Sequence, residues 1–335
     1  MRLYCCDHSY DNIFLQVSAM NFLVIGTNFI SDKFCFAAKR VGGVKVVAVY
    51  SRKNATGIAF AERNGIERVY DDLDKALSDK DVDAVYVASP TFLHREHSIR
   101  AMRAGKDVLC EKSIALSGDE LSEMLSVAKE EKRVLLEAMR PAFDPALEAI
   151  RSGMAMIGKI RRASLEFCQY SSRYDNFKAG IVENAFDPSI GNSALSDIGV
   201  YPLWLAVELF GRPIRVSSEK TYLENGFLGM GVSTLDYGDA LVTVTYSKIN
   251  QGVLPSVIEG ELGSLVINKV SEPREITVRL RGEEENNLYL SECENNMIYE
   301  IAAFKKMVDG EMDNSHYLKV TEEVMKIADE IHAAE

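Results

Sequence analysis

The stretch from Asn21 to Phe34 reads NFLVIGTNFISDKF, which is a short apolar run, one glycine and then a helical pattern. A dinucleotide-binding turn with the fingerprint G-x-G-x-x-G follows a buried strand and opens a helix. Only Gly26 matches a glycine of this fingerprint, and Asn28 and Ser31 stand at the other two positions. Asn is among the few other residues that adopt left-handed conformations, and Ser is small enough for a helix to pack closely on a strand. The stretch therefore indicates either a nucleotide-binding turn with two glycines replaced or an ordinary strand-to-helix loop.

Length and composition are those of a globular protein with two domains. The chain has 335 residues, of which 47% are hydrophobic and 26% charged, and its net charge is -12. We expect no nucleic-acid partner, because basic residues do not cluster beyond pairs such as Arg161-Arg162. The six cysteines show no C-x-x-C spacing, and Cys5 and Cys6 are adjacent, so we expect reduced thiols and no metal site.

The beginning of the chain predicts neither a membrane span nor a signal peptide. No apolar run reaches 18 residues, and residues 1–20 lack the apolar middle region of a signal peptide. We therefore expect a cytoplasmic protein without a membrane partner. Residues 1–20 have no clear period, and Met20 is a candidate for the functional start, so this leader is left out of the fold prediction.

Two patterns divide the remaining chain near residue 140. Between residues 21 and 140, buried strands alternate with helices, which predicts a Rossmann domain with a doubly wound parallel sheet. Residues 141–335 predict an α+β domain with a large open antiparallel sheet, which would bind substrate and form oligomers. The predicted strands of the first domain lie at 22–25, 44–50, 83–89, 107–111 and 133–138, and its helices include 29–38, 93–104 and one capped by Ser117 and Glu120. The predicted elements of the second domain are a helix at 145–152, strands at 162–170, 239–246, 256–259 and 264–270, and final helices at 297–310 and 319–334.

Ligands of doubly wound sheets bind at the carboxyl ends of the strands, so the residues after each strand are candidates for the site. Ser51 and Arg52 follow the second run and could bind a ribose 2′-phosphate, or could belong to a solvated basic loop. The segment SPTFLH, residues 89–94, follows a later strand. Lys112 follows the strand at 107–111, where it could equally form a structural ion pair with Glu111.

Four segments together resemble the superfamily of glucose-fructose oxidoreductases, inositol dehydrogenases and rhizopine-catabolism proteins (Gfo/Idh/MocA). They are VYVASPTFLH (85–94), AMRAGKDVLCEKSIAL (101–116), EAMRPAFDP (137–145) and SDIGVYPLWLAVELFG (196–211). The resemblance runs from about Asn21 to the C-terminus. The chain looks most like the branch of dimeric dihydrodiol dehydrogenases, in which the last position of the second-domain motif is Tyr, as Tyr201 is here. The resemblance implies a nicotinamide-dependent oxidoreductase that acts on a sugar, polyol or diol and assembles into a homodimer or homotetramer.

The resemblance also implies a role for each matching residue. Lys112 would lie by the nicotinamide ribose and the reacting oxygen, Asp197 would orient substrate, and Tyr201 would transfer the proton. A free tyrosine has a pKa near 10, and we expect the Lys112 ammonium to favour its ionised form. The cofactor would be bound by Gly26, Thr27, Asn28, Phe29 and Ile30 at a helix N-terminus, by Ser51 and Arg52, by Ser89, Pro90, Thr91 and His94, and by Glu111 and Lys112.

The cofactor prediction is NADP(H), with NAD(H) possible, because residues 46–53 contain no carboxylate for the ribose hydroxyls of NAD. Ser113 stands where the family has proline. The resemblance therefore does not predict the backbone conformation at this position, including whether the bond before it is cis. Arg140, Arg173 and Tyr174 are candidate substrate contacts, with exposed surface residues as the alternative for at least one. The alternative function is a sensor that binds nucleotide without turnover, as a galactose-pathway repressor of the same superfamily does.

Overall fold

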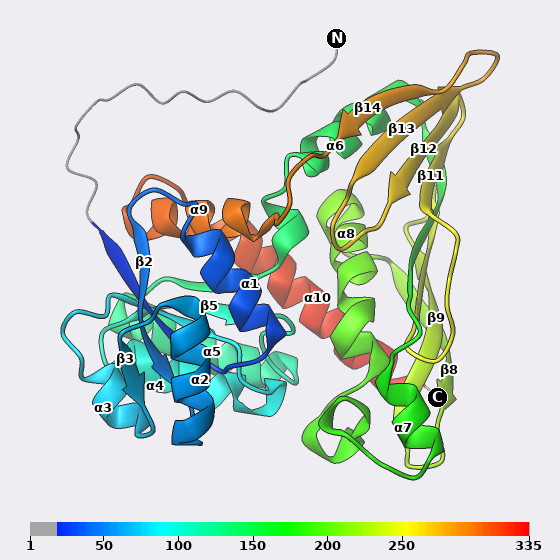
Figure 1. Cartoon of the computed structure of the whole chain (residues 1–335). Helices are drawn as coiled ribbons and strands as arrows, with labels where there is room; N and C mark the ends of the chain where they lie inside the picture. Colours follow the sequence, from blue (N-terminus) through cyan, green and yellow to red (C-terminus); the bar gives the residue numbers. More distant parts are fainter. Residues whose placement is uncertain (1–18, 335) are drawn as a thin grey trace.

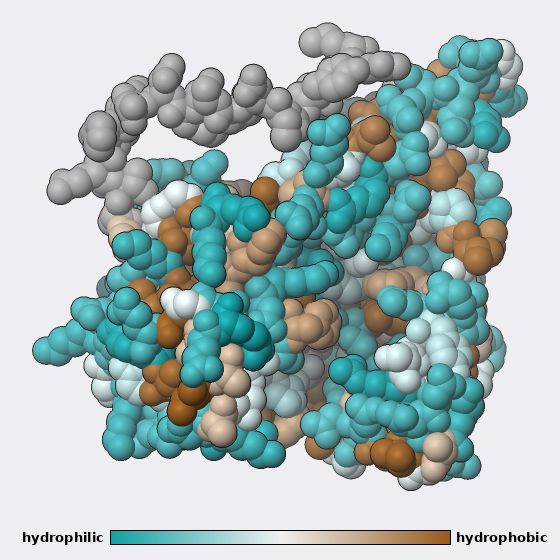
Figure 2. Space-filling view, in the orientation of Figure 1, coloured by the Kyte–Doolittle hydropathy of each residue, from teal (hydrophilic) through white to brown (hydrophobic). Residues whose placement is uncertain are grey.

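The computed structural model describes residues 19–334 and contains two large sheets with helices around and between them (Figure 1). The predicted leader falls outside this range except for Ala19 and Met20, and β1 begins at Met20. In the described residues no helix has the length and apolar character needed to cross a membrane. The surface in the same orientation is mostly hydrophilic, and a groove separates the two halves in the lower part of the view (Figure 2).

The first sheet has six parallel strands in the order β3-β2-β1-β4-β5-β6, which confirms the predicted Rossmann fold. Its strands are β1 (Met20–Ile25), β2 (Val44–Tyr50), β3 (Arg68–Tyr70), β4 (Ala84–Val87), β5 (Asp107–Glu111) and β6 (Leu135–Ala138). Its helices are α1 (Phe29–Ala38), α2 (Asn54–Asn64), α3 (Leu73–Leu77), α4 (His94–Arg103) and α5 (Gly118–Glu131). The edge strand β3 was not predicted, because three partly exposed residues give no apolar run.

The capping of α5 follows the prediction with one difference. The hydroxyl of Ser117 accepts a hydrogen bond from the N–H of Glu120 at 3.3 Å. The carboxylate of Glu120 reaches back to the N–H of Leu116 at 3.0 Å, one residue before the expected donor. The helix therefore begins where the sequence places it.

The second sheet has eight strands in the order β14-β13-β12-β11-β7-β10-β9-β8. They are β7 (Ile160–Cys168), β8 (Arg215–Tyr222), β9 (Leu228–Asp236), β10 (Leu241–Ser247), β11 (Ser256–Gly260), β12 (Gly263–Asn268), β13 (Glu275–Leu280) and β14 (Asn286–Leu290). Within the described chain one neighbouring pair, β7 and β10, is parallel, so the sheet is mostly rather than fully antiparallel. A parallel pair needs a long crossover, and the chain between these strands supplies it with several helical segments and the hairpin of β8 and β9.

Beyond β6 the described chain has five further α-helices: α6 (Ala146–Met156), α7 (Arg173–Lys178), α8 (Val200–Phe210), α9 (Met297–Val308) and α10 (Ser315–Ala333). Helix α8 lies on the inner face of the second sheet, and α10 crosses from α8 to α5 between the two sheets (Figure 1). Helix α9 returns to the first sheet, where Phe304 shares a core with Phe22 and Phe34. The carboxyl ends of the parallel strands are thereby fixed opposite the start of α8.

Candidate active site

The turn after β1 requires glycine at one position. Gly26 has a φ of +107°, and a Cβ built on it would lie 2.4 Å from the carbonyl oxygen of Ala88, at the end of β4. A side chain would therefore meet the neighbouring backbone and would also strain the chain. The close approach of β1 and β4 explains why this glycine is present although its two counterparts are not.

Asn28 does not use the left-handed conformation that an Asn residue can adopt. Its φ of -84° and ψ of 179° are extended, and its side chain caps α1. The side-chain oxygen accepts hydrogen bonds from the N–H groups of Ile30 at 3.1 Å and Ser31 at 3.3 Å, while its amide donates to Ala88. An extended residue does not need to be glycine, so this replacement leaves the backbone of the turn intact.

The helix N-terminus retains donors for an anion. Within the described chain the N–H groups of Thr27, Asn28 and Phe29 form no hydrogen bond, and all three point from a turn that carries the positive end of the α1 dipole. Phe29 is 66% exposed, which is unusual for a large apolar side chain. The turn thus fits the pyrophosphate of a dinucleotide. It offers fewer free N–H groups than a turn with glycine at position 28 would, because the Asn28 side chain occupies those of Ile30 and Ser31.

The end of β2 presents a cation. Arg52 is exposed, whereas the hydroxyl of Ser51 donates to the carbonyl of Lys53 at 3.0 Å. Arg52 is therefore accessible to a ribose 2′-phosphate, and Ser51 would have to exchange its local bond to reach one.

His94 does not present a free polar atom to the nicotinamide end. It is 2% exposed, and its ring nitrogens lie 2.9 Å from the carbonyl oxygen of Ser113 and 2.8 Å from that of Ser89. Burial lowers the pKa of His94 to about 4, so the ring is neutral at pH 7 and its single N–H donates to one carbonyl at a time. We correct the expectation accordingly: His94 joins the turns after β4 and β5, while Ser89, Pro90 and Thr91 remain partly exposed beside it.

Glu111 and Lys112 do not form the ion pair that their adjacency suggested. The Glu111 carboxylate is buried and accepts a hydrogen bond from the Tyr86 hydroxyl at 2.5 Å, so its side chain faces the protein interior and not the cofactor. Lys112 is the first residue after β5. The peptide bond between Lys112 and Ser113 is cis.

Lys112 instead contacts Asp197 from the other half of the molecule. Its ammonium donates to the main-chain carbonyl of Asp197 at 2.5 Å and to Oδ1 of the same residue at 3.1 Å. Burial alone would lower the pKa of Lys112, but Asp197, Tyr201 and Glu111 outweigh it and raise the pKa above its ordinary value. The ammonium therefore stays protonated at pH 7.

Asp197 is held between two lysines. Its second oxygen lies 2.7 Å from the ammonium of Lys248, a residue that the sequence analysis missed. Burial alone would raise the pKa of Asp197, but the ammonium groups of Lys112 and Lys248 hold it well below the ordinary value. Asp197 is thus a carboxylate at any physiological pH and cannot exchange a proton with substrate. The signal that could have found Lys248 is the one that marked Lys112, a lysine directly after a buried strand.

Asp197 lies in a π-helical turn, Leu195–Gly199, that runs directly into α8. Such turns are rare and are frequent at functional sites. A Cβ on Gly199 would lie 2.7 Å from the ring of Tyr246 on the second sheet. The glycine of the motif Asp-x-Gly therefore lets the start of α8 pack closely against β10.

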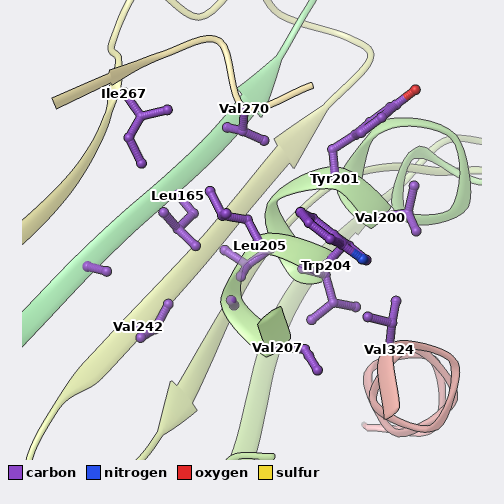
Figure 3. Close-up of a cluster of buried hydrophobic side chains, with 14 of the residues drawn as sticks. Leu165, Val200, Tyr201, Trp204, Leu205, Val207, Val242, Ile267, Val270 and Val324 are labelled. Atoms are coloured by element: carbon purple, nitrogen blue, oxygen red, sulfur yellow. The ribbon is translucent and has the colours of Figure 1, made fainter. Parts of the chain in front are cut away.

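Tyr201 follows on the first turn of α8, and its hydroxyl points away from the hydrophobic cluster that includes Leu165 and Leu205 (Figure 3). The guanidinium of Arg140 donates to this hydroxyl at 3.4 Å. The Lys112 ammonium lies over the ring face, 5.3 Å from its centre. The cation that donates to the hydroxyl is therefore Arg140, while the Lys112 ammonium, which we expected to favour the ionised form of Tyr201, lies over the ring face.

Arg173 and Tyr174 lie on α7 (Arg173–Lys178), outside the contacts just described. Arg173 pairs with Glu183 and is half exposed, as the surface alternative predicted. Tyr174 stacks on Phe177 and Phe186 in a small aromatic cluster. Of the three substrate candidates, the structure brings only Arg140 to Tyr201.

We define the polar cluster as Lys112, Arg140, Asp197, Tyr201 and Lys248. It joins the carboxyl ends of β5 and β6 to the start of α8 and the end of β10. Its cations can stabilise negative charge that develops on a reacting oxygen, and its phenol can exchange a proton with that oxygen. In residues 19–334, no group of three or more acidic, His or Cys side chains could hold a metal ion.

Comparison with known proteins places this arrangement in a family. Residues 20–139 match the model of an oxidoreductase family with an NAD-binding Rossmann fold. The chain is 37% identical to scyllo-inositol 2-dehydrogenase (NADP(+)) of Bacillus subtilis (strain 168), over 86% of this chain and 88% of that protein. It is 27% identical to trans-1,2-dihydrobenzene-1,2-diol dehydrogenase of Xenopus tropicalis, over 70% and 67% of the two chains.

The fold also matches that of a solved enzyme. The 3-ketoreductase KijD10 of Actinomadura kijaniata, determined with NADP and TDP-benzene, superposes with a TM-score of 0.83 at 23% identity, over 95% of this chain and 98% of that one. The resemblance drawn from the motifs is confirmed, and the chain belongs to the Gfo/Idh/MocA family of NAD-binding oxidoreductases.

Proposed function

We propose that this protein uses NADP(H), in preference to NAD(H), to transfer a hydride to or from a CH–OH or C=O carbon of a small sugar, polyol or diol. The observation that carries the proposal is the polar cluster, which lies at the carboxyl ends of the parallel strands where such sheets bind ligands. The names of two relatives support the substrate class, since scyllo-inositol and trans-1,2-dihydrobenzene-1,2-diol both carry neighbouring hydroxyl groups.

The cofactor would be held by residues of the first sheet. The N–H groups of Thr27, Asn28 and Phe29 would bind the pyrophosphate, and Arg52 would bind the 2′-phosphate. When bound, the nicotinamide ring supplies or accepts the hydride. Ser89, Pro90 and Thr91 would line the nicotinamide end from the turn after β4.

The polar cluster would accept or donate the proton of the substrate hydroxyl and stabilise the charge on the substrate oxygen. In oxidation, the carbon loses its hydride and the hydroxyl loses its proton to Tyr201, while Lys112 stabilises the charge on the substrate oxygen. Arg140 would donate a hydrogen bond to the Tyr201 oxygen that accepts the proton. Asp197 would orient Lys112 and does not transfer a proton, because the two lysines keep it ionised.

A panel of polyols, aldoses and diols, followed by the absorbance of NADPH, tests the reaction. We expect turnover with a compound that has neighbouring hydroxyl groups. A protein that binds NADP(H) tightly but reduces or oxidises no compound of the panel would instead match the sensor alternative.

Arg52 offers a test of cofactor choice. A charge-assisted bond to the 2′-phosphate contributes roughly 1.5 to 3 kcal/mol, which is about ten- to a hundredfold in affinity. We expect NADP(H) to bind more tightly than NAD(H), and Arg52→Ala to remove most of the difference. Equal titration curves for both cofactors in the unmodified protein would contradict the assignment.

We further propose that the protein is cytoplasmic and forms a homodimer or homotetramer through the second sheet, with residues 21–140 binding cofactor and 141–335 binding substrate. Helices α6, α8 and α10 lie on one face of this sheet (Figure 1). The other face carries partly exposed apolar side chains such as Val232 and Leu241. Light scattering at micromolar concentration tests this, and a monomer would contradict it.

A further inference from the structure

Lys248 is a buried cation whose neighbours come from three separate segments. It follows directly on β10, and its side chain is 6% exposed. The ammonium lies 2.7 Å from Oδ2 of Asp197 and donates to the carbonyl of Ala185 at 2.9 Å. It also lies 4.9 Å from the ring centre of Phe186 and 5.4 Å from that of Phe227. A buried ammonium is destabilising unless it is paired and hydrogen-bonded, and these contacts supply both conditions.

The two lysines divide the oxygens of Asp197 between them. Lys112 takes Oδ1 and the main-chain carbonyl, and Lys248 takes Oδ2. A carboxylate that is bonded through both oxygens cannot rotate about its χ2 angle without losing a charged contact. Lys248 therefore fixes the plane of the carboxylate, and through Oδ1 it fixes the position of the Lys112 ammonium.

Lys248 also anchors the segment between β7 and the π-helical turn. Ala185 and Phe186 belong to a short 3₁₀ turn, Asn184–Phe186, in this segment. The Phe186 ring packs on Phe227 at 4.7 Å between ring centres, and its carbonyl accepts a bond from Asn225. The segment, the second sheet and Asp197 thus meet at one ammonium.

We propose that Lys248 is a positioning residue for the reaction, one that aligns Lys112 through Asp197 and ties this alignment to the fold of residues 171–192. The proposal deepens the proposed function and rests on it for its kinetic test. The charged and titratable groups that face Asp197 are Lys112, directly after β5, Lys248, directly after β10, and Tyr201 from α8, with Arg140 beyond the Tyr201 hydroxyl.

Lys248→Met removes the ammonium and keeps most of the apolar stem. A misplacement of about 1 Å costs up to roughly a hundredfold in rate, so we expect kcat to fall by about 10- to 100-fold while the KM for substrate changes little. Lys248→Arg should recover part of the lost kcat, because it restores a cation. The matched control is Lys220→Met, which removes a partly buried ammonium bonded to main-chain carbonyls at the end of α10, away from Asp197.

The pH profile separates positioning from a structural role. With one ammonium instead of two, Asp197 becomes easier to protonate, and its ionised form is the one that orients Lys112. Lys248→Met should therefore lose activity as the pH falls, at a higher pH than the unmodified protein does, and Lys220→Met should not. Should Lys248→Met fail to fold, Lys248→Gln keeps hydrogen-bond donors for Ala185 and Asp197, lacks the charge and should show the same acid limb.

Hydrogen exchange tests the structural half without substrate. The N–H groups of Phe186 and Asp187 are bonded within the turn that Lys248 anchors, at 2.8 Å and 3.2 Å. We expect these amides to exchange faster in Lys248→Met and to be unchanged in Lys220→Met. Unchanged exchange, or an active protein whose kcat and pH profile are indifferent to Lys248→Met, would overturn the proposal. Absence of any turnover in the unmodified protein would instead contradict the proposed function, and the exchange result would still decide whether Lys248 anchors the segment.

Discussion

The turn at Gly26 and the polar cluster are the two halves of the proposed site, and they depend on sequence in different ways. The turn acts through main-chain groups, so it tolerates Asn28 and Ser31 where glycines were expected, provided that Gly26 remains. The cluster acts through charged and phenolic side chains from separate elements, and each of these groups contacts a side chain from another element. Replaced motif residues therefore do not argue against a site that binds through main-chain groups. In a site that acts through side chains, the same replacements would remove the function.

The largest expected effect is a loss of the rate of hydride transfer on substitution in the polar cluster. Lys112→Met removes the ammonium at the reacting oxygen, and we expect the rate of hydride transfer to fall by roughly 10² to 10⁴. The matched control is Lys106→Met just before β5, where the ammonium donates to the carbonyls of Asp79 and Val82. Single-turnover kinetics should show a normal rate for the control. Equal rates in both variants would place Lys112 outside the chemistry.

In the turn, which acts through main-chain groups, the most damaging substitution should be at Gly26. Gly26→Ala introduces a side chain at a φ of +107° and 2.4 Å from a carbonyl oxygen. Strain of this kind costs about 1 to 3 kcal/mol before the clash is counted, and we expect NADP(H) affinity to fall by more than about tenfold. Gly42→Ala is the control, because its added Cβ would meet nothing within 4 Å. Calorimetric titration that finds both variants equal would show that the turn does not hold the cofactor.

Glu137 supports the turn that carries Lys112. Its carboxyl group accepts bonds from the N–H of Ile114 and from the hydroxyl of Thr321 on α10. Burial raises the pKa of Glu137 from 4.5 to about 7. A raised pKa means that the stabilising contribution is complete below pH 4.5 and is lost as the pH rises through about 7, which is roughly 3 kcal/mol in total.

Glu137→Gln keeps an acceptor for the N–H of Ile114, can donate to the Thr321 hydroxyl instead of accepting from it, and does not titrate. We expect urea unfolding to show less loss of stability between pH 5 and pH 8 in this variant than in the unmodified protein. Glu131→Gln, at an exposed position on α5, serves as control and should leave the pH dependence unchanged. If Glu137→Gln also leaves it unchanged, the carboxyl group does not titrate as proposed.

The smallest effect should come from Asn28. Asn28→Gly removes the cap of α1 and frees the N–H groups of Ile30 and Ser31, and the loss of an Asn cap to Gly is only a few tenths of a kcal/mol. We expect NADP(H) to bind at least as tightly as before. A loss of affinity beyond about tenfold would mean that the Asn28 side chain itself contacts the cofactor.

The sequence predicts the fold where interactions are local. Continuous apolar runs such as 22–25 marked the buried parallel strands, and the helix at 29–38 agrees with the structure residue for residue. The parallel pairing of β7 with β10 was missed, because register between strands far apart in the chain leaves no local pattern. The three-residue strand β3 is too short to show any period.

The site was predicted as a set of residues and not as a set of contacts. The sequence suggested the adjacent Glu111 as an ion-pair partner for Lys112. The partner in the structure is Asp197, which comes from the second half of the chain. Lys248 and the bond between Arg140 and Tyr201 were missed for the same reason, since pairs of this kind exist only after both sheets have packed on α8 and α10. Nothing in the sequence indicated that His94 is buried, with its ring nitrogens beside the carbonyl oxygens of Ser113 and Ser89.

The central claim is that Tyr201 transfers the proton, and Tyr201→Phe tests it most directly. The variant removes one oxygen and keeps the ring that packs beside Phe167, so NADP(H) binding should survive. With the best substrate of the panel, we expect single-turnover hydride transfer to slow by roughly 10² to 10⁴. Retention of more than about a tenth of the rate would contradict the assignment, because a lost general acid or base has a larger effect.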